Sequence, residues 1–304
     1  MTANIQKSWV IDDAGAQMTM KNFLHKKLHF SRRLLTAIRK QGGKCLLNEK
    51  EAHMKEILHL HDQLTVIFPD ETSGHIEATE MELTIVYEDD DYLVIDKPAG
   101  QACMPGMNDR YTSLANGIQS YYNASGHPAT VHIVTRLDKN TSGLVLVAKN
   151  RYAHALLSEA QKKHQIHRVY EAMITGKIEP SAGTIQAPIA RKEASIIERE
   201  VNKEKGKEAI THYRTVSSHT RASSLRVQLE TGRTHQIRVH FSHLGHPLLG
   251  DDLYGGKTDD IQRQALHCAA LEWVHPFTKK RMRFDCPLPL DMVNCMKKLT
   301  VPPT

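Results

Sequence analysis

Residues 134–143, Val-Thr-Arg-Leu-Asp-Lys-Asn-Thr-Ser-Gly, contain two side chains that could carry out chemistry, Arg136 and Asp138. In an extended chain these side chains point to one face and Leu137 points to the other. A carboxylate in such a position can act as a nucleophile or as a general base. The alternative is a plain turn before the apolar run at 144–148, because Asp, Asn, Thr, Ser and Gly favour local hydrogen bonds to the backbone.

A second polar stretch, residues 230–247, predicts a strand that ends at Gly232 and a helix that follows it. The residues that this helix is expected to bury are Ile237, Phe241 and Leu244. His235 and Arg238 are three residues apart and share another face. Arg233 and Arg238, near the helix start, are suited to bind a carboxylate or a phosphate.

The spacing of histidines and cysteines argues against a metal site. Four histidines lie between residues 235 and 246, but they form no His-Glu-x-x-His motif and no suitably spaced carboxylate accompanies them. The five cysteines form no Cys-x-x-Cys pair, so we expect reduced and mostly buried thiols.

Tyr170 is the third candidate, on a predicted strand at 168–174. Alternation places it on the same side of the strand as Ala172 and Ile174. In general, a tyrosine in such a position is more often a core aromatic residue with a satisfied hydroxyl than a catalytic group. The strand pattern alone leaves both interpretations open.

The elements that must position these residues belong to a chain of 304 residues, 40% hydrophobic and 24% charged. This composition excludes disordered, collagen-like and coiled-coil architectures, and the length predicts one large and one small domain. The longest aliphatic run, at 143–148, is far too short to span a bilayer, and the N-terminus lacks the layout of a signal peptide. We therefore expect a cytoplasmic protein with no membrane partner.

The large domain is expected at residues 83–304, after a polar linker at 69–82. Strand-like runs dominate it, and 113–122 and 151–164 have helical patterns. Few strand–helix–strand crossovers occur in this order of elements. The pattern predicts an α+β fold built on a mixed, largely antiparallel sheet.

Positive charge is concentrated near the N-terminus. The chain carries a formal net charge of +6, and residues 21–55 alone hold ten basic and two acidic residues. Within this segment Ser31 is a suitable N-cap and Gly42-Gly43 a suitable stop for a short basic amphipathic helix. On charge alone, a solvated charged surface is the favoured interpretation, because basic runs are common and weakly specific.

The order of elements favours a binding module. Two short helices, the second starting with Arg-Arg, precede a hairpin that carries Asn-x-Lys, and residues 18–68 thus resemble the RNA-binding domain of small-subunit ribosomal protein S-four. His61-Asp62 stands where that domain usually has Gly-Asp, and residues 1–17 are expected to form an extension outside it. The resemblance implies that one group of basic side chains lies along RNA phosphates, namely Arg32, Arg33, Arg39 and Lys40.

The three polar stretches together resemble the RluA-type family of pseudouridine synthases. The matching motifs are Arg-Leu-Asp-x-x-Thr-Ser-Gly, Tyr-x-Ala, Gly-Arg-Thr-His-Gln-Ile-Arg-Val-His, and the later Leu-His-Cys-Ala-Ala-Leu with His-Pro. Lys-Pro-Ala-Gly at 97–100 matches a further block, and the resemblance extends over about residues 83–291. The family usually has His before Arg-Leu-Asp, where this chain has Thr135.

The resemblance implies an enzyme that isomerises uridine in RNA to pseudouridine, with Asp138 as the essential carboxylate. Asp138 would attack the sugar C1′ or the pyrimidine C6, or assist glycal formation, and the sequence does not choose among these routes. Arg238 would keep it ionised, and Tyr170 would stack on the uracil or handle the proton at C5. Arg136 would fill the gap that the extruded base leaves.

The implied partner is RNA, with large-subunit ribosomal RNA favoured and transfer RNA as the alternative, and Arg233 and His235 belong to the expected RNA contacts. The resemblance implies no cofactor, no metal and no obligate protein partner. Two rival functions stay open: a non-catalytic RNA-binding protein on the same scaffold, and a hydrolytic N-glycosidase. The second would need another carboxylate to activate water, and none stands out in the motifs.

Overall fold

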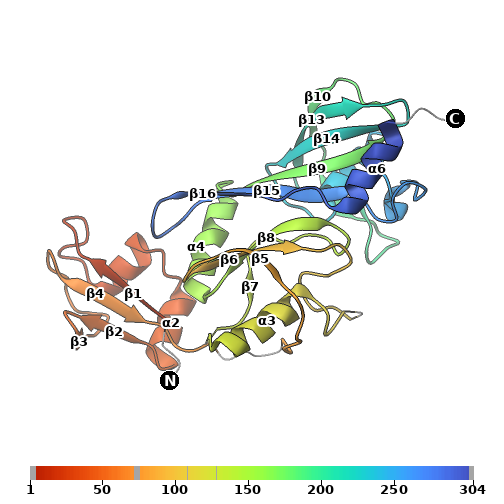
Figure 1. Cartoon of the computed structure of the whole chain (residues 1–304). Coiled ribbons are helices and arrows are strands. Elements are labelled where there is room, and N and C mark those ends of the chain that lie inside the picture. The colour runs from red at the N-terminus through yellow and green to blue at the C-terminus, as the bar shows by residue number, and fades with distance from the viewer. Residues whose placement is uncertain (1–4, 72–75, 108, 128, 301–304) are drawn as a thin grey trace.

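The chain is organised into a small N-terminal unit and a large unit, each built on its own main sheet (Figure 1). A further two-stranded sheet, formed by β11 (Ile189–Arg191) and β12 (Arg199–Val201), belongs to the large unit. The computed structural model describes residues 5–71, 76–107, 109–127 and 129–300. Part of the predicted linker, residues 72–75, therefore lies outside the described residues, as do 1–4 of the predicted extension and 301–304 of the predicted large domain.

The small unit combines a four-stranded sheet, in the order β1-β4-β2-β3, with short helical segments. Its elements are β1 (Gln6–Val10), α1 (Met20–Asn22), the π-helix η1 (Phe23–Lys27), α2 (Arg32–Lys40), β2 (Lys44–Leu47), β3 (Lys50–Glu51) and β4 (Gln63–Ile67). The predicted basic helix is α2, and the side chain of Ser31 caps it by accepting a hydrogen bond from Leu34 N. Its apolar stripe is buried, so α2 packs one face on the sheet and exposes its basic face.

The structure corrects the expected boundary between the extension at 1–17 and the small domain. β1 pairs antiparallel with β4, from Gln6 opposite Ile67 to Val10 opposite Gln63. Ile11, which follows β1, is completely buried. The alternating exposure along β1 is that of an edge strand with one packed face, so the small unit includes residues before 18.

The large unit contains the remaining elements. They are β5 (Thr84–Glu88), β6 (Tyr92–Lys97), α3 (Leu114–Ser125), β7 (His132–Ile133), β8 (Ser142–Ala148), α4 (Arg151–Lys162), β9 (His167–Thr175), β10 (Ala182–Gln186), β11 (Ile189–Arg191), β12 (Arg199–Val201), β13 (Ile210–Ser218), β14 (Ala222–Leu229), α5 (Gln236–His243), the 3₁₀-helix η2 (Asp252–Tyr254), β15 (Leu266–Val274), β16 (Arg281–Asp285) and α6 (Leu290–Thr300).

The main sheet runs in the order β10-β13-β14-β9-β15-β8-β6-β5, with β16 paired to β15 and β7 paired to β8. Among the described strands, β8 and β15 form the one parallel pair, and every other pairing is antiparallel. The predicted α+β class with a mixed, largely antiparallel sheet is thus confirmed. Every residue of β8 is buried, as expected for a central strand covered on both faces.

One predicted core residue is wrong. Ile237 and Phe241 are buried as expected, but 43% of Leu244 is exposed. The reason is that α5 ends at His243, so Leu244 leaves the helix as its C-cap and no longer follows the apolar stripe. No helix in the described part of the chain combines the length and the apolar character that a membrane crossing requires.

Candidate active site

An open cavity of 520 Å³ lies where the loop before β8 meets β9 and the start of α5. Among the residues that line it are six of the sequence-predicted site residues: Arg136, Asp138, Tyr170, Arg233, His235 and Arg238. The structure therefore brings together side chains that are up to about one hundred residues apart in the chain. The predicted basic residues of the small unit lie elsewhere, on and around α2.

The loop that carries Asp138 is anchored on both sides of that residue. On one side, Leu137 is buried and its N–H donates to Cys103 Sγ at 3.3 Å. On the other side, Lys97 Nζ donates to the carbonyl oxygen of Lys139 at 3.1 Å. Thr141 N–H donates to the Asp138 carbonyl oxygen at 3.0 Å and closes the turn. The residues around Asp138 do form the turn that the local sequence favours, and this turn faces the cavity.

Lys97 connects the Asp138 loop to the segment that follows β6. Its side chain is completely buried, and Nζ also donates to the carbonyl oxygens of Pro98 and Gln101, at 2.7 and 2.8 Å. Burial lowers the pKa of Lys97 to about 8. A protonated amine has three N–H donors, one for each of the three carbonyl groups.

Asp138 faces a guanidinium that a second carboxylate holds in place. Arg238 Nη1 lies 3.4 Å from Asp138 Oδ2, while Arg238 Nε and Nη2 each donate to Asp251 at 2.7 Å, to Oδ2 and Oδ1 respectively. Asp251 is completely buried, whereas 25% of the Asp138 side chain is exposed. The bidentate pair fixes the planar guanidinium and leaves one edge directed at Asp138. Asp138 Oδ1 accepts no hydrogen bond from the described residues.

Arg238 and His235 are two basic side chains next to Asp138 Oδ2. Burial opposes the charge of Arg238, but the hydrogen bonds and charge of Asp251 outweigh burial and raise the pKa of Arg238. His235 Nε2 lies 4.0 Å from Asp138 Oδ2, and burial, together with the neighbouring Arg238, lowers the pKa of His235. At neutral pH the positive charge next to Asp138 therefore belongs to Arg238.

Tyr170 is 4% exposed and lines the cavity from β9. Its hydroxyl accepts a hydrogen bond from Arg168 Nη1 at 3.3 Å, and Tyr170 also forms a side-chain hydrogen bond with the Cys268 thiol. Burial raises the pKa of Tyr170, so the side chain stays a neutral phenol. The side chain is thus both a packed aromatic residue and part of the cavity wall.

Arg136 and Arg233 extend from the cavity rim. Both are exposed, and Arg136 makes no ion pair within the described chain, while Arg233 Nε donates to the carbonyl oxygen of Glu208. Gln236, which is buried, shapes the loop that carries Arg233. Its amide accepts from Arg233 N–H at 2.9 Å and donates to Thr211 Oγ1 of β13 at 3.0 Å.

Sequence reasoning missed Asp251, Tyr254 and the role of Lys97. Tyr254 Oη lies 2.8 Å from His235 Nδ1, and the Arg238 guanidinium lies over the Tyr254 ring at 4.9 Å. The available signal was the Gly-Asp-Asp-Leu-Tyr sequence at 250–254, where two acids and a tyrosine follow a glycine. That sequence does not show which acid is buried.

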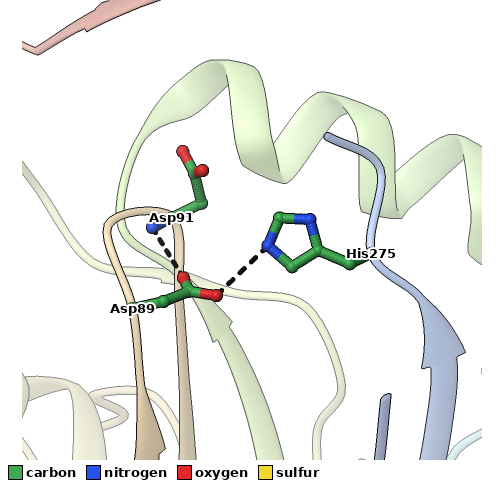
Figure 2. Close-up of side chains that lie close together, drawn as sticks. All are labelled: Asp89, Asp91 and His275. Atoms are coloured by element: carbon green, nitrogen blue, oxygen red, sulfur yellow. Dashed lines mark hydrogen bonds and ion pairs between the residues drawn. The ribbon is translucent and has the colours of Figure 1, made fainter. Parts of the chain in front are cut away.

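One group among the described residues brings possible metal ligands within 4.8 Å of one another: Asp89, Asp91 and His275. Figure 2 shows Asp89 between the Asp91 backbone and the His275 ring. Lys7 Nζ already contacts Asp91 Oδ2 at 2.6 Å, and Asp89 Oδ2 accepts from Tyr87 Oη at 2.7 Å and from His275 Nε2 at 3.1 Å. These hydrogen bonds and this ion pair engage the atoms that would bind a metal.

Comparisons with known proteins match this chain to RNA pseudouridine synthases. Residues 91–243 match the RNA pseudouridylate synthase family. A Bacillus subtilis protein named uncharacterized RNA pseudouridine synthase YjbO is 46% identical over 281 residues, which are 92% of this chain and 99% of the relative. Ribosomal large subunit pseudouridine synthase D of Pseudomonas aeruginosa is 40% identical over 83% of each chain. The structure of human RNA Pseudouridylate Synthase Domain Containing 1 covers 70% of this chain and 87% of its own, at 26% identity and a TM-score of 0.58.

Proposed function

The chain belongs to the RluA-type RNA pseudouridine synthase family, and from this premise we propose that Asp138 is the catalytic carboxylate with which it converts uridine to pseudouridine in ribosomal RNA. The observation that carries this proposal is the Asp138–Arg238 pair in the open cavity, 3.4 Å from oxygen to nitrogen. Arg238 places a positive charge beside the carboxylate and orients it, while the other oxygen of Asp138 is left for the substrate.

The reaction breaks the bond between N1 and C1′, turns the uracil, forms a bond between C5 and C1′, and transfers a proton from C5 to solvent while N1 gains one. Asp138 Oδ1 is the atom that would attack C1′ or C6, or assist the glycal route. All three routes need an ionised carboxylate that is accessible to the nucleoside. One quarter of the Asp138 side chain is exposed, which supports this access.

A uridine in folded RNA reaches this cavity only after it leaves its stack, at a cost of a few kcal/mol. Arg136 would fill the vacated position, because its guanidinium is exposed at the rim and unpaired within the described residues. Arg233 and His235 would contact the RNA beside it. Tyr170 would stack on the uracil, or pass on the C5 proton through its neutral hydroxyl.

Ribosomal RNA is the proposed substrate because several relatives are named ribosomal large subunit pseudouridine synthases. The basic face of α2 supports this choice, since Arg32, Arg33, Arg39 and Lys40 would bind RNA phosphates. The five free, buried cysteines suit action in the reducing cytoplasm.

A hydrolytic N-glycosidase is disfavoured by the state of the second carboxylate. Asp251 is completely buried and both its oxygens accept from Arg238, so it has no free oxygen to activate water.

The test uses an unmodified large-subunit ribosomal RNA transcript labelled with tritium at uracil C5. We expect the protein to release tritium from the transcript, while every nucleotide of the product still carries a base bonded to its sugar. No release would indicate a non-catalytic RNA-binding protein, and abasic RNA would indicate a glycosidase. Pseudouridine mapping in cells with and without the protein would then identify the modified uridine.

A further inference from the structure

The small unit is fixed to the large unit by a buried aromatic contact and an ion pair. The rings of Phe30 and Tyr152 lie 4.2 Å apart between centroids, and Tyr152 Oη donates to the carbonyl oxygen of Leu28 at 3.0 Å. On the same junction, Lys7 of β1 pairs with Asp91 at 2.6 Å. Tyr152 belongs to α4, so these contacts hold α2 beside the start of α4.

This junction creates a groove of 450 Å³ whose walls come from both units. From α2 come Arg32, Arg33 and Lys40, and from the first position of α4 comes Arg151. Arg39 of α2 does not line it. Docking of the two units thus adds Arg151 to the three cations that α2 already presents at this hollow.

None of the four side chains makes an ion pair with a described residue. One acid at the junction is Glu71, but it is mostly buried, with Oε1 accepting from Arg151 N–H at 2.7 Å and Oε2 next to His132 Nε2 at 2.5 Å. Four cations of like sign in one hollow repel each other and favour a polyanion as ligand.

Resting on the proposed function, we propose that this groove binds the phosphodiester backbone of the RNA substrate, with Arg151 as a contact supplied by the catalytic unit. Guanidinium groups match phosphate oxygens with two hydrogen bonds each. The remaining lining, Thr36, Ala37 and Gln41, is small or polar. An acidic protein would need apolar anchors to form a stable interface, and this groove offers only one alanine.

α4 links the groove to the active site. Arg151 lines the groove, and Gln161, ten residues later on α4, lines the catalytic cavity. At 1.5 Å per residue the two positions are about 15 Å apart along the helix. That length corresponds to roughly four nucleotides of a stacked strand at 3.4 Å each. One RNA segment can therefore occupy both sites.

The test is the affinity of Arg151→Ala for the unmodified large-subunit ribosomal RNA transcript, measured between 50 and 200 mM salt. We expect a loss of about five- to eightfold at 0.1 M salt, and a slope of log affinity against log salt that is flatter by about 0.7 to 0.9, the effect of one phosphate contact. Lys40→Ala, on the α2 side of the groove, should give the same change. Arg221→Ala removes an exposed arginine from the turn between β13 and β14 and should bind like the wild type.

A wild-type affinity and slope for Arg151→Ala, with an unchanged unfolding midpoint, would overturn the composite groove, even if Lys40→Ala weakens binding. An equal loss in Arg221→Ala would also overturn it, because the effect would then follow total charge. Binding is read without turnover, so these results are independent of tritium release. If the wild type releases tritium but Arg151→Ala binds RNA like the wild type, only this inference is refuted. If Arg151→Ala loses affinity as expected but the wild type releases no tritium, only the proposed function is refuted.

Discussion

Replacing Asp251 by asparagine should displace the Arg238 guanidinium, although the buried Asp251 itself would not contact the substrate. Asp251 holds the guanidinium through two hydrogen bonds of 2.7 Å, and Asp138 receives only the remaining edge at 3.4 Å. An asparagine keeps one oxygen but presents an N–H₂ group to a guanidinium that has no acceptor. Arg238 must then turn away from the asparagine, toward Asp138 or out into the cavity.

The size of the effect follows from burial. Asp251 is completely buried and 7% of the Arg238 side chain is exposed, so solvent screens this pair little. Removing one partner of a buried ion pair costs about 3–5 kcal/mol of stability, out of a total of about 5–15 kcal/mol for a folded domain. A catalytic group displaced by about 1 Å can lose about a hundredfold in rate.

The assays are urea unfolding at 25 °C and single-turnover tritium release. Asp252→Asn is the matched control, because the neighbouring Asp252 is exposed and, among the described residues, accepts a hydrogen bond only from Leu253 N–H. We expect the free energy of unfolding of this control to lie within about 0.5 kcal/mol of the wild-type value, and its rate of tritium release to be that of the wild type. An unfolding free energy of Asp251→Asn within about 1 kcal/mol of the wild-type value would contradict this prediction. So would a loss of stability accompanied by the wild-type rate of tritium release.

Two further predictions concern the support of the loop that carries Asp138. Gly143 has φ 109°, and a Cβ there would lie 2.3 Å from the Cys268 carbonyl oxygen. Gly143→Ala should therefore lower the free energy of unfolding in urea by at least about 2 kcal/mol. Gly106→Ala is the control, because the space around Gly106 is open, and its free energy of unfolding should stay within about 0.5 kcal/mol of the wild-type value. The pKa of Lys97, lowered to about 8 from 10.5 in the unfolded chain, means that between these values the unfolded state binds more protons and stability rises with pH. Lys97→Met should remove a contribution of up to about 1.4 kcal/mol per pH unit in that window, and parallel stability–pH curves for the two proteins would count against it.

Local patterns predicted the elements well because they depend on neighbouring residues. The cap at Ser31 and the continuous apolar run of β8 are visible in the sequence and hold in the structure. β1 was missed because its sequence, Gln-Lys-Ser-Trp-Val, does not alternate between apolar and polar residues, and its alternating exposure arises only when it pairs with β4.

The candidate site was predictable only in part. The family resemblance implied that Asp138, Tyr170 and Arg238 share one site, and in the structure all three line one cavity. Asp251 could not be distinguished from Asp252, since burial depends on how the 250–254 turn packs against α5. Likewise, the groove that includes Arg151 exists only through the docking of two units, which no local pattern shows.

The central claim is tested most directly by tritium release from C5-labelled ribosomal RNA by Asp138→Asn. Asparagine keeps the shape of the side chain and its hydrogen-bonding oxygen, but it removes the charge that the chemistry requires. We predict no detectable release together with wild-type RNA affinity and a folded protein. Release at a rate close to that of the wild type would show that another group performs the reaction.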